Sequence, residues 1–222
     1  MSRISIAVSQ ILLALLASIA HAPAAAGQRA EQGAFAILVG ADTFAVETFT
    51  RYADRVEGEI TGRAVGRLGY TMWIDGSAGV PNLTLRYWGP TADLDGPPVQ
   101  EADLAVVADT VVLQITNPPG IDAQRIPSRA GAFIYVNPSF VMAEQMVLHA
   151  RARGSDSVDF PVFMAQGEDT AAARVSLAPG DTALVTILGS VMRLVMDEQG
   201  RLASAAIPAQ GVTVVRTQRE DL

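Results

Sequence analysis

From Gln32 onward, apolar and polar positions alternate with a period of two, which is the pattern of β-strands that bury one face. In "FAVETFTRY", Phe44 and Val46 share one face of the expected strand, and Glu47 and Arg51 share the other. Strands with one apolar face are typical of antiparallel sheets. The pattern therefore predicts an antiparallel sheet with one buried side.

Two tryptophans occupy neighbouring expected strands, "RLGYTMWIDG" and "NLTLRYW", the first of which ends in an Asp-Gly turn signal. The alternation puts Trp73 and Trp88 on one face. The opposite face carries Tyr70, Met72 and Tyr87. The tryptophans form either an exposed platform or an outer face that loops cover while a helix covers the inner one. We favour the second interpretation.

Short apolar segments of this kind recur roughly a dozen times at regular spacing, which is typical of a sandwich or barrel. Two polar, proline-containing stretches, 89–103 and 117–131, are interpreted as long loops. The predicted fold is mainly all-β: a strongly curved antiparallel sheet, or a partly open β-barrel, that wraps one helix. Its interior is expected to receive Phe35, Ile37, Tyr70, Met72, Leu83, Leu85, Val185, Ile187, Met192, Leu194 and Met196.

One segment, "NPSFVMAEQMVLHARARG", departs from the strand pattern and predicts a helix over about 138–153. Asn137 suits the N-cap, and Pro138 suits the first helical position. Gly154 is a natural stop after the last turn. The expected helix is apolar on two sides, so we expect it to be buried on two sides, within the concavity of the sheet.

Residues 1–26 contain one arginine, then an apolar run, then small residues, which is the pattern of a secretory signal peptide. Its cleavage leaves 27–222, predicted to be a single β-rich domain in the periplasm or outside the cell, with no stable membrane anchor. The chain has no cysteine, so it has neither a lipid-attachment cysteine nor disulfides.

Charge and composition remove several function classes. The formal net charge is −7, which makes nucleic acid and anionic membranes poor partners. All 16 basic residues are arginine. Without lysine, the chain has no Walker-A phosphate loop, no Ser-x-x-Lys acylation site and no lysine Schiff base.

His149 is the histidine that remains after the predicted cleavage. No cysteine or Gly-x-Ser-x-Gly motif accompanies it, so we interpret it as a solvated partner of the helix dipole. One imidazole does not make a zinc site of the usual kind. A calcium loop at Asp93 and Asp95 is disfavoured because Leu104 stands where an EF-hand needs glutamate. No catalytic residue, metal or cofactor is predicted.

Four stretches, 35–51, 69–90, 137–154 and 191–216, resemble exported bacterial β-meander domains of unknown function, and the likeness extends over nearly all of 32–217. In these domains a half-barrel wraps one helix. Similar modules precede an α/β-hydrolase domain in some secreted esterase-like proteins. The 222 residues leave no room for such a domain, so the resemblance supplies no catalytic residue. A more distant likeness is to periplasmic Lol-type lipoprotein carriers, whose half-barrels hold acyl chains under a helical lid.

The pattern and the resemblance together favour an exported, non-catalytic domain that binds an apolar or lipid-like ligand between sheet and helix. The methionine-rich helix supports this, because methionine adapts to irregular apolar partners. The alternative is a module with a filled core that binds another envelope protein, and a carboxylate-dependent hydrolase is the least favoured. The expected ligand-binding residues are Tyr70, Met72, Phe140, Met142, Met146, Met192 and Leu194.

Overall fold

The computed structural model describes residues 30–217 except 94 and 118–119. Within that part, fifteen strands form one continuous sheet in the order β8-β7-β6-β5-β4-β3-β2-β1-β15-β14-β13-β12-β11-β10-β9. All neighbouring pairs are antiparallel except β9 with β10, which is parallel. The first eight strands are β1 (Glu31–Val39), β2 (Asp42–Arg51), β3 (Arg55–Gly62), β4 (Gly66–Trp73), β5 (Asn82–Trp88), β6 (Gln100–Val107), β7 (Thr110–Asn117) and β8 (Gly120–Pro127).

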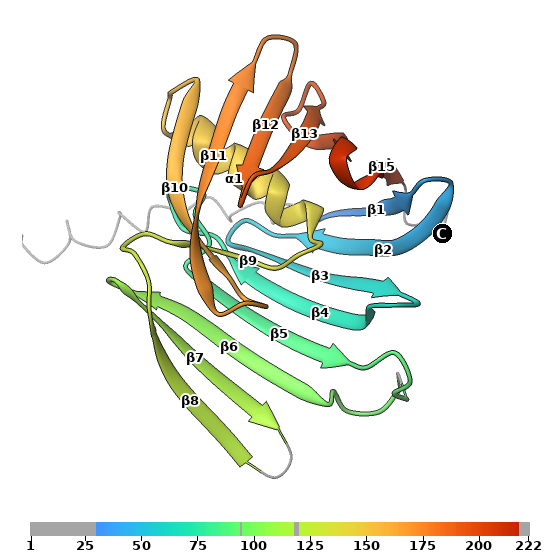
Figure 1. Ribbon diagram of the computed structural model, residues 1–222, viewed down its shortest axis with the longest axis vertical. Helices are drawn as coiled ribbons and strands as arrows, with labels where there is room; N and C mark the ends of the chain where they lie inside the picture. The colour runs from blue at the N-terminus through green and yellow to red at the C-terminus, as the bar shows by residue number, and fades with distance from the viewer. Residues whose placement is uncertain (1–29, 94, 118–119, 218–222) are drawn as a thin grey trace, which may run out of the picture.

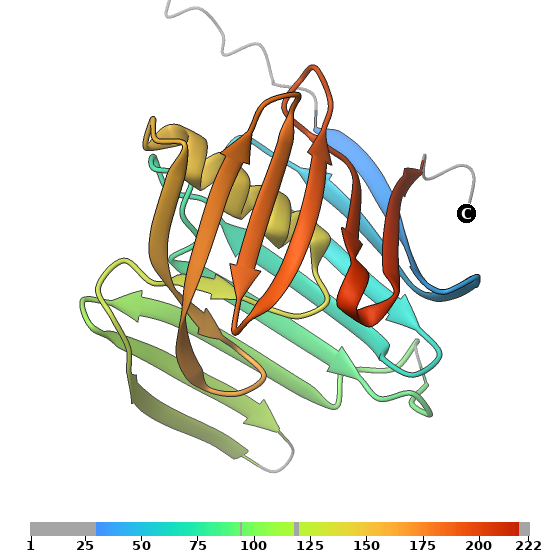
Figure 2. The same ribbon diagram turned by 45° about the horizontal axis from the view of Figure 1, so that its top comes forward.

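The second half of the chain returns to β1 from the other side, and β15 pairs with β1. Figures 1 and 2 show the two halves of the sheet facing each other, with the helix α1 between them. The remaining elements are β9 (Phe133–Tyr135), α1 (Phe140–Ala152), β10 (Ser157–Met164), β11 (Asp169–Ala178), β12 (Thr182–Ile187), β13 (Ser190–Met196), β14 (Leu202–Ile207), the 3-10 turn η1 (Pro208–Gln210) and β15 (Val212–Thr217). The predicted fold class, a curved antiparallel sheet around one helix, is confirmed.

The core lies between α1 and the concave face of the sheet. The eleven residues predicted to point inward do so, and ten of them are buried. Leu85 is only partly buried. Both sides of α1 are covered, as its two apolar stripes predict, because each half of the sheet packs against one of them.

The helix begins two residues later than predicted. Its N-cap is Ser139, whose hydroxyl accepts a hydrogen bond from the backbone N–H of Met142 at 3.1 Å. Asn137 is therefore not the cap, and Pro138 precedes the helix instead of opening it. Gly154 follows the last turn with a φ of 66°, a conformation that glycine adopts at no steric cost.

Two strand predictions are wrong. Gly120–Pro127 forms β8 within the stretch interpreted as a loop, because backbone pairing with β7 needs few apolar side chains on an exposed edge. On β2 the interior side is the one with Glu47 and Arg51, whereas Phe44 is 37% exposed. The two charged groups are tolerated inside because both bond to α1.

Candidate functional sites

Glu47 lies at the N-terminus of α1 and is fully buried. Its Oε2 accepts hydrogen bonds from the backbone N–H groups of Phe140 (2.7 Å) and Val141 (3.2 Å). Its Oε1 accepts from the hydroxyls of Ser139 (2.6 Å) and Tyr70 (2.8 Å). Burial raises the pKa of Glu47 to about 7, although these four donors act in the opposite direction. The carboxyl group thus joins β2 to the helix end whose N–H groups lack intrahelical partners.

A buried ion pair holds the middle of α1. Glu144 is fully buried, and one of its oxygens lies 2.6 Å from Nη2 of Arg51 on β2. Arg201 lies 3.6 Å from the same carboxylate, and the backbone N–H of Leu202 donates to its other oxygen at 3.2 Å. Burial raises the pKa of Glu144, while the arginines lower it. These contacts connect the helix to both halves of the sheet.

His149 lies near the C-terminus of α1 and is 3% exposed, so the prediction of a solvated histidine is wrong. Its Nδ1 donates to the carbonyl oxygen of Ser77 at 2.7 Å, and its ring packs edge-on against Phe160 with centroids 5.1 Å apart. Nε2 is buried without a hydrogen-bond partner among the described residues. Burial lowers the pKa of His149, which favours the neutral imidazole.

The two carboxyl groups with raised pKa, Glu47 and Glu144, belong to the packed interior, and neither lines the two cavities described next. The described residues contain no group of three or more His, Cys, Asp or Glu side chains able to hold a metal ion. In the same part of the chain, no helix has the length and apolarity needed to cross a bilayer.

The seven predicted ligand-binding residues are all in the core. Each is at most 4% exposed, so their side chains fill the space between α1 and the sheet. Met142, for example, packs so closely that its sulfur accepts a hydrogen bond from the backbone N–H of Val136 at 3.3 Å. Their role in ligand binding stays a prediction. A larger open space on the concave side lies elsewhere, beyond the N-terminus of the helix.

A cavity of about 440 Å³ lies there, which we call the inner pocket. Its floor consists of inward-facing side chains of β4, β5 and β6, including Leu68, Leu85 and Ala102. Leu68 and Leu85 are only partly buried because the helix does not extend over this end of the sheet. The full lining is Val65, Leu68, Leu85, Tyr87, Gln100, Ala102, Val136, Asn137, Ala165, Gln166 and Glu168.

The opposite wall of the inner pocket is the segment that leads from β9 into α1, joined to the turn after β10. The backbone N–H of Asn137 donates to Oε1 of Gln166 at 3.2 Å, and Nε2 of Gln166 donates to the carbonyl oxygen of Asn137. The backbone N–H of Ala165 donates to the carbonyl oxygen of Tyr135 at 3.0 Å. These bonds hold the two segments of the wall together.

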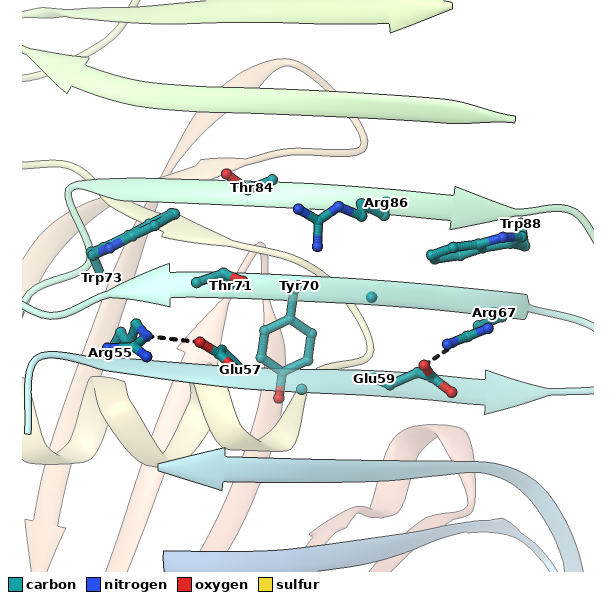
Figure 3. A pocket seen from close by; sticks show the side chains of 12 residues that line it. Arg55, Glu57, Glu59, Arg67, Tyr70, Thr71, Trp73, Thr84, Arg86 and Trp88 are labelled. Carbon is teal, nitrogen blue, oxygen red and sulfur yellow. Dashed lines mark hydrogen bonds and ion pairs between the residues drawn. The ribbon is translucent and has the colours of Figure 1, made fainter. Parts of the chain in front are cut away.

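A second hollow of about 570 Å³, the outer groove, lies on the convex face of β3, β4 and β5. Figure 3 shows Trp73 and Trp88 at its two ends, with Arg86 between them. Trp88 is covered: its Nε1–H donates to the carbonyl oxygen of Gly96 at 2.8 Å, and the guanidinium of Arg67 lies 4.5 Å from its ring centroid. Trp73 is 38% exposed. The expectation that loops cover the outer face is therefore confirmed for Trp88 and wrong for Trp73.

The sequence predicts the strands on which both cavities lie, but not which residues line the cavities. The alternation identified Tyr87 and Leu85 as inward and Trp73 as outward. It gave no indication of where the helix stops covering the inner face, which decides the position of the inner pocket. A signal was available in the expected helix, because a helix over about 138–153 already leaves Val136 and Asn137 outside it.

The fold is similar to that of a DUF1089 family protein from Pseudomonas aeruginosa, with a TM-score of 0.52 and 14% sequence identity over 78% of this chain and 94% of that one. A β-barrel-like protein of the domain of unknown function DUF1849 from Brucella abortus aligns with a TM-score of 0.45 and 10% identity, covering 85% of this chain and 95% of that one. No family model and no curated protein sequence matches the chain. The first similarity shows a shared fold, and a shared fold assigns no function.

Proposed function

We propose that the protein is an exported, non-catalytic domain that binds a small lipid-like ligand in the inner pocket. The observation that carries the proposal is the partly exposed apolar floor at Leu68 and Leu85, because such surface inside a concavity is normally covered by a partner. The pocket volume of about 440 Å³ lies within the range of small-molecule sites.

The distribution of polar groups indicates the kind of ligand. Apolar side chains form the floor, while Gln100, Asn137, Gln166 and Glu168 add amide and carboxyl groups to the lining. Ligand sites typically combine an apolar surface with a few polar groups that fix orientation. An acyl chain or a similar apolar body with one hydrogen-bonding end suits this lining. The ligand would lie between the sheet and the segment that enters the helix.

Export is supported by the signal-peptide pattern at 1–26, which lies outside the described residues. The absence of cysteine is compatible with any compartment, because such a fold needs no oxidising environment. Export is tested by N-terminal sequencing of the protein from an exporting host, and the sequence obtained is expected to begin at Gly27. Retention of Met1 on protein in the cytoplasm would contradict export.

Ligand binding is tested by native mass spectrometry of 27–222, purified from an exporting host without detergent. We expect an adduct that is released on denaturation and identified as a fatty acid or phospholipid. A bare protein that also fails to take up cis-parinaric acid would refute the proposal.

A paired substitution assigns the binding to the inner pocket. Ala165→Trp places an indole in the pocket lining and is expected to abolish cis-parinaric acid binding. Ala172→Trp, at an exposed alanine of β11, is the matched control and is expected to bind as the wild type does. Equal binding by both variants would place the ligand elsewhere.

One observation favours the alternative, a protein-interaction module of the cell envelope. The convex face of β12 and β13 exposes Leu184, Val191 and Val195, which are neighbours on one surface. Exposed apolar groups that gather in this way are typical of contact surfaces. Cross-linking from position 184, on the neighbouring strand, in an envelope extract would test it. A single partner, lost from Val191→Asp but retained by Ala165→Trp, would support the alternative.

A further inference from the structure

The outer groove is built from side chains that share the convex face of three neighbouring strands. In register across β3, β4 and β5, the row Glu57, Thr71, Thr84 lies beside the row Glu59, Gly69, Arg86. Gly69 has no side chain to fill the centre, and a Cβ there would approach the ring of Trp88 to 3.5 Å. Small residues in the middle and large ones around them leave the hollow that Figure 3 shows.

The groove is long enough for a chain-like ligand. Arg67, which covers Trp88, and Trp73 lie six residues apart on β4. At about 3.3 Å per residue, this separation is about 20 Å. Both ends are on rigid, paired strands, so the spacing is fixed without a ligand.

Charges in the groove are balanced locally. Arg55 pairs with Glu57 at 2.7 Å, and Arg67 pairs with Glu59 at 2.6 Å. Arg86 lies 3.4 Å from Glu101. Each cation thus has an acidic neighbour, so the surface offers many hydrogen-bonding groups and little net charge. A polyanion would find no uncompensated positive stripe, and the acidic chain adds a general repulsion.

The exposed apolar surface in the groove is essentially one indole. Protein interfaces bury an apolar centre surrounded by a polar rim, which a single tryptophan among paired charges and threonines does not provide. A flat ring flanked by carboxylates, guanidinium groups and hydroxyls instead matches a ligand with alternating C–H faces and hydroxyl groups. Neutral sugars have that chemistry.

We propose that the outer groove binds a neutral oligosaccharide that lies along β4, with one sugar ring stacked on Trp73. The next rings lie over Gly69 and Thr71, where Glu57, Thr84 and Arg86 hydrogen-bond their hydroxyls. Thr84 already donates its hydroxyl to Asp103 at 2.5 Å, so it serves the sugar as an acceptor. The site is on the opposite face of the sheet from the inner pocket and does not depend on it.

The test is affinity electrophoresis of the folded protein in gels that contain a neutral polysaccharide: hydroxyethyl cellulose, xylan, galactomannan or laminarin. Alginate and heparin gels serve as anionic comparisons. The variants are Trp73→Ala, Trp73→Phe and Phe44→Ala. Phe44 is the matched control, because it is 37% exposed, close to the 38% of Trp73, and lies outside the groove.

We expect at least one neutral polysaccharide to retard the wild type and Phe44→Ala equally. Trp73→Ala is expected to weaken binding by about tenfold or more, since it removes the exposed ring on which a sugar stacks and tryptophan is among the residues whose truncation is typically most costly. Trp73→Phe should recover part of the loss. No retardation by any neutral polymer, retardation by alginate or heparin alone, or unchanged binding by Trp73→Ala would each overturn the proposal.

Discussion

Replacing Glu47 by glutamine tests whether the capping carboxyl group of the helix holds its proton up to neutral pH. Its pKa is raised from 4.5 to about 7 by burial. The folded state therefore binds this proton more tightly than the unfolded chain does. Stability from this group is fully present below about pH 4.5 and is lost as the pH rises through about 7. At 1.36 kcal/mol per pKa unit, the loss is about 3 kcal/mol.

Glutamine preserves much of the hydrogen bonding. Its carbonyl oxygen replaces Oε2 and accepts from the N–H groups of Phe140 and Val141, while its amide donates toward the hydroxyl oxygens of Ser139 and Tyr70. Glutamine has no carboxyl proton, so the substitution removes the titration of this side chain. The free energy of unfolding of Glu47→Gln minus that of the wild type is therefore expected to increase by about 3 kcal/mol between about pH 4.5 and pH 8.

The assay is urea unfolding of 27–222 across that pH range, followed by circular dichroism. Glu198→Gln is the control, since Glu198 is exposed in a turn and its substitution should shift the curve little. A difference that does not change with pH would refute the reasoning. A difference of opposite sign would show that the four donors and the helix dipole keep the carboxylate ionised despite its burial.

Three further predictions concern the interior. Glu144→Ala removes the shortest ion pair of buried Arg51, which keeps only the longer contacts to Gln145 and Glu31, and is expected to lower the free energy of unfolding, measured in urea, by about 3 kcal/mol. Gly58→Ala puts a Cβ 2.3 Å from the ring of Tyr70 and 2.9 Å from a backbone oxygen, so we expect about 1–3 kcal/mol of destabilisation and a lower melting temperature. Burial lowers the pKa of His149 from 6.5, so the wild type should lose stability as the pH falls below about 6.5. His149→Phe removes this group, and the variant is expected to lose less stability over the same pH range in the same urea assay. Unchanged stability of Glu144→Ala or Gly58→Ala, or an unchanged loss on acidification in His149→Phe, would contradict the corresponding prediction.

The sequence predicts the fold class because strands and helix each repeat a local pattern. Alternation at Tyr70 and Met72 and the apolar stripes around Met146 need only neighbouring residues to be recognised. The polar contacts of α1 are different. Glu47 and Ser139 are 92 residues apart, so their meeting depends on where the helix packs on the sheet, which no local pattern contains.

For the candidate sites, too, the local pattern predicts one part and contacts between distant residues decide the other. Alternation tells which face a residue points to, and it placed Trp73 outside and Leu85 inside. It does not tell how far along that face the helix extends. The expected ligand contacts therefore fall under the helix, in the filled core, while the open pocket lies where the cover ends.

The pairing of β1 with β15 also bears on how the chain is made. Ala34 lies opposite Thr217, so this seam joins residues that are far apart in the chain, and Ala34 is synthesised well before Thr217. The hairpins from β1 to β8 can form locally, but contacts of such high sequence separation form slowly because they require closure of a long loop. Until β10 to β15 arrive, the apolar concave side of the first half is open to water. The nascent protein is therefore expected to need a holding chaperone, and truncation before β10 should give an aggregating product.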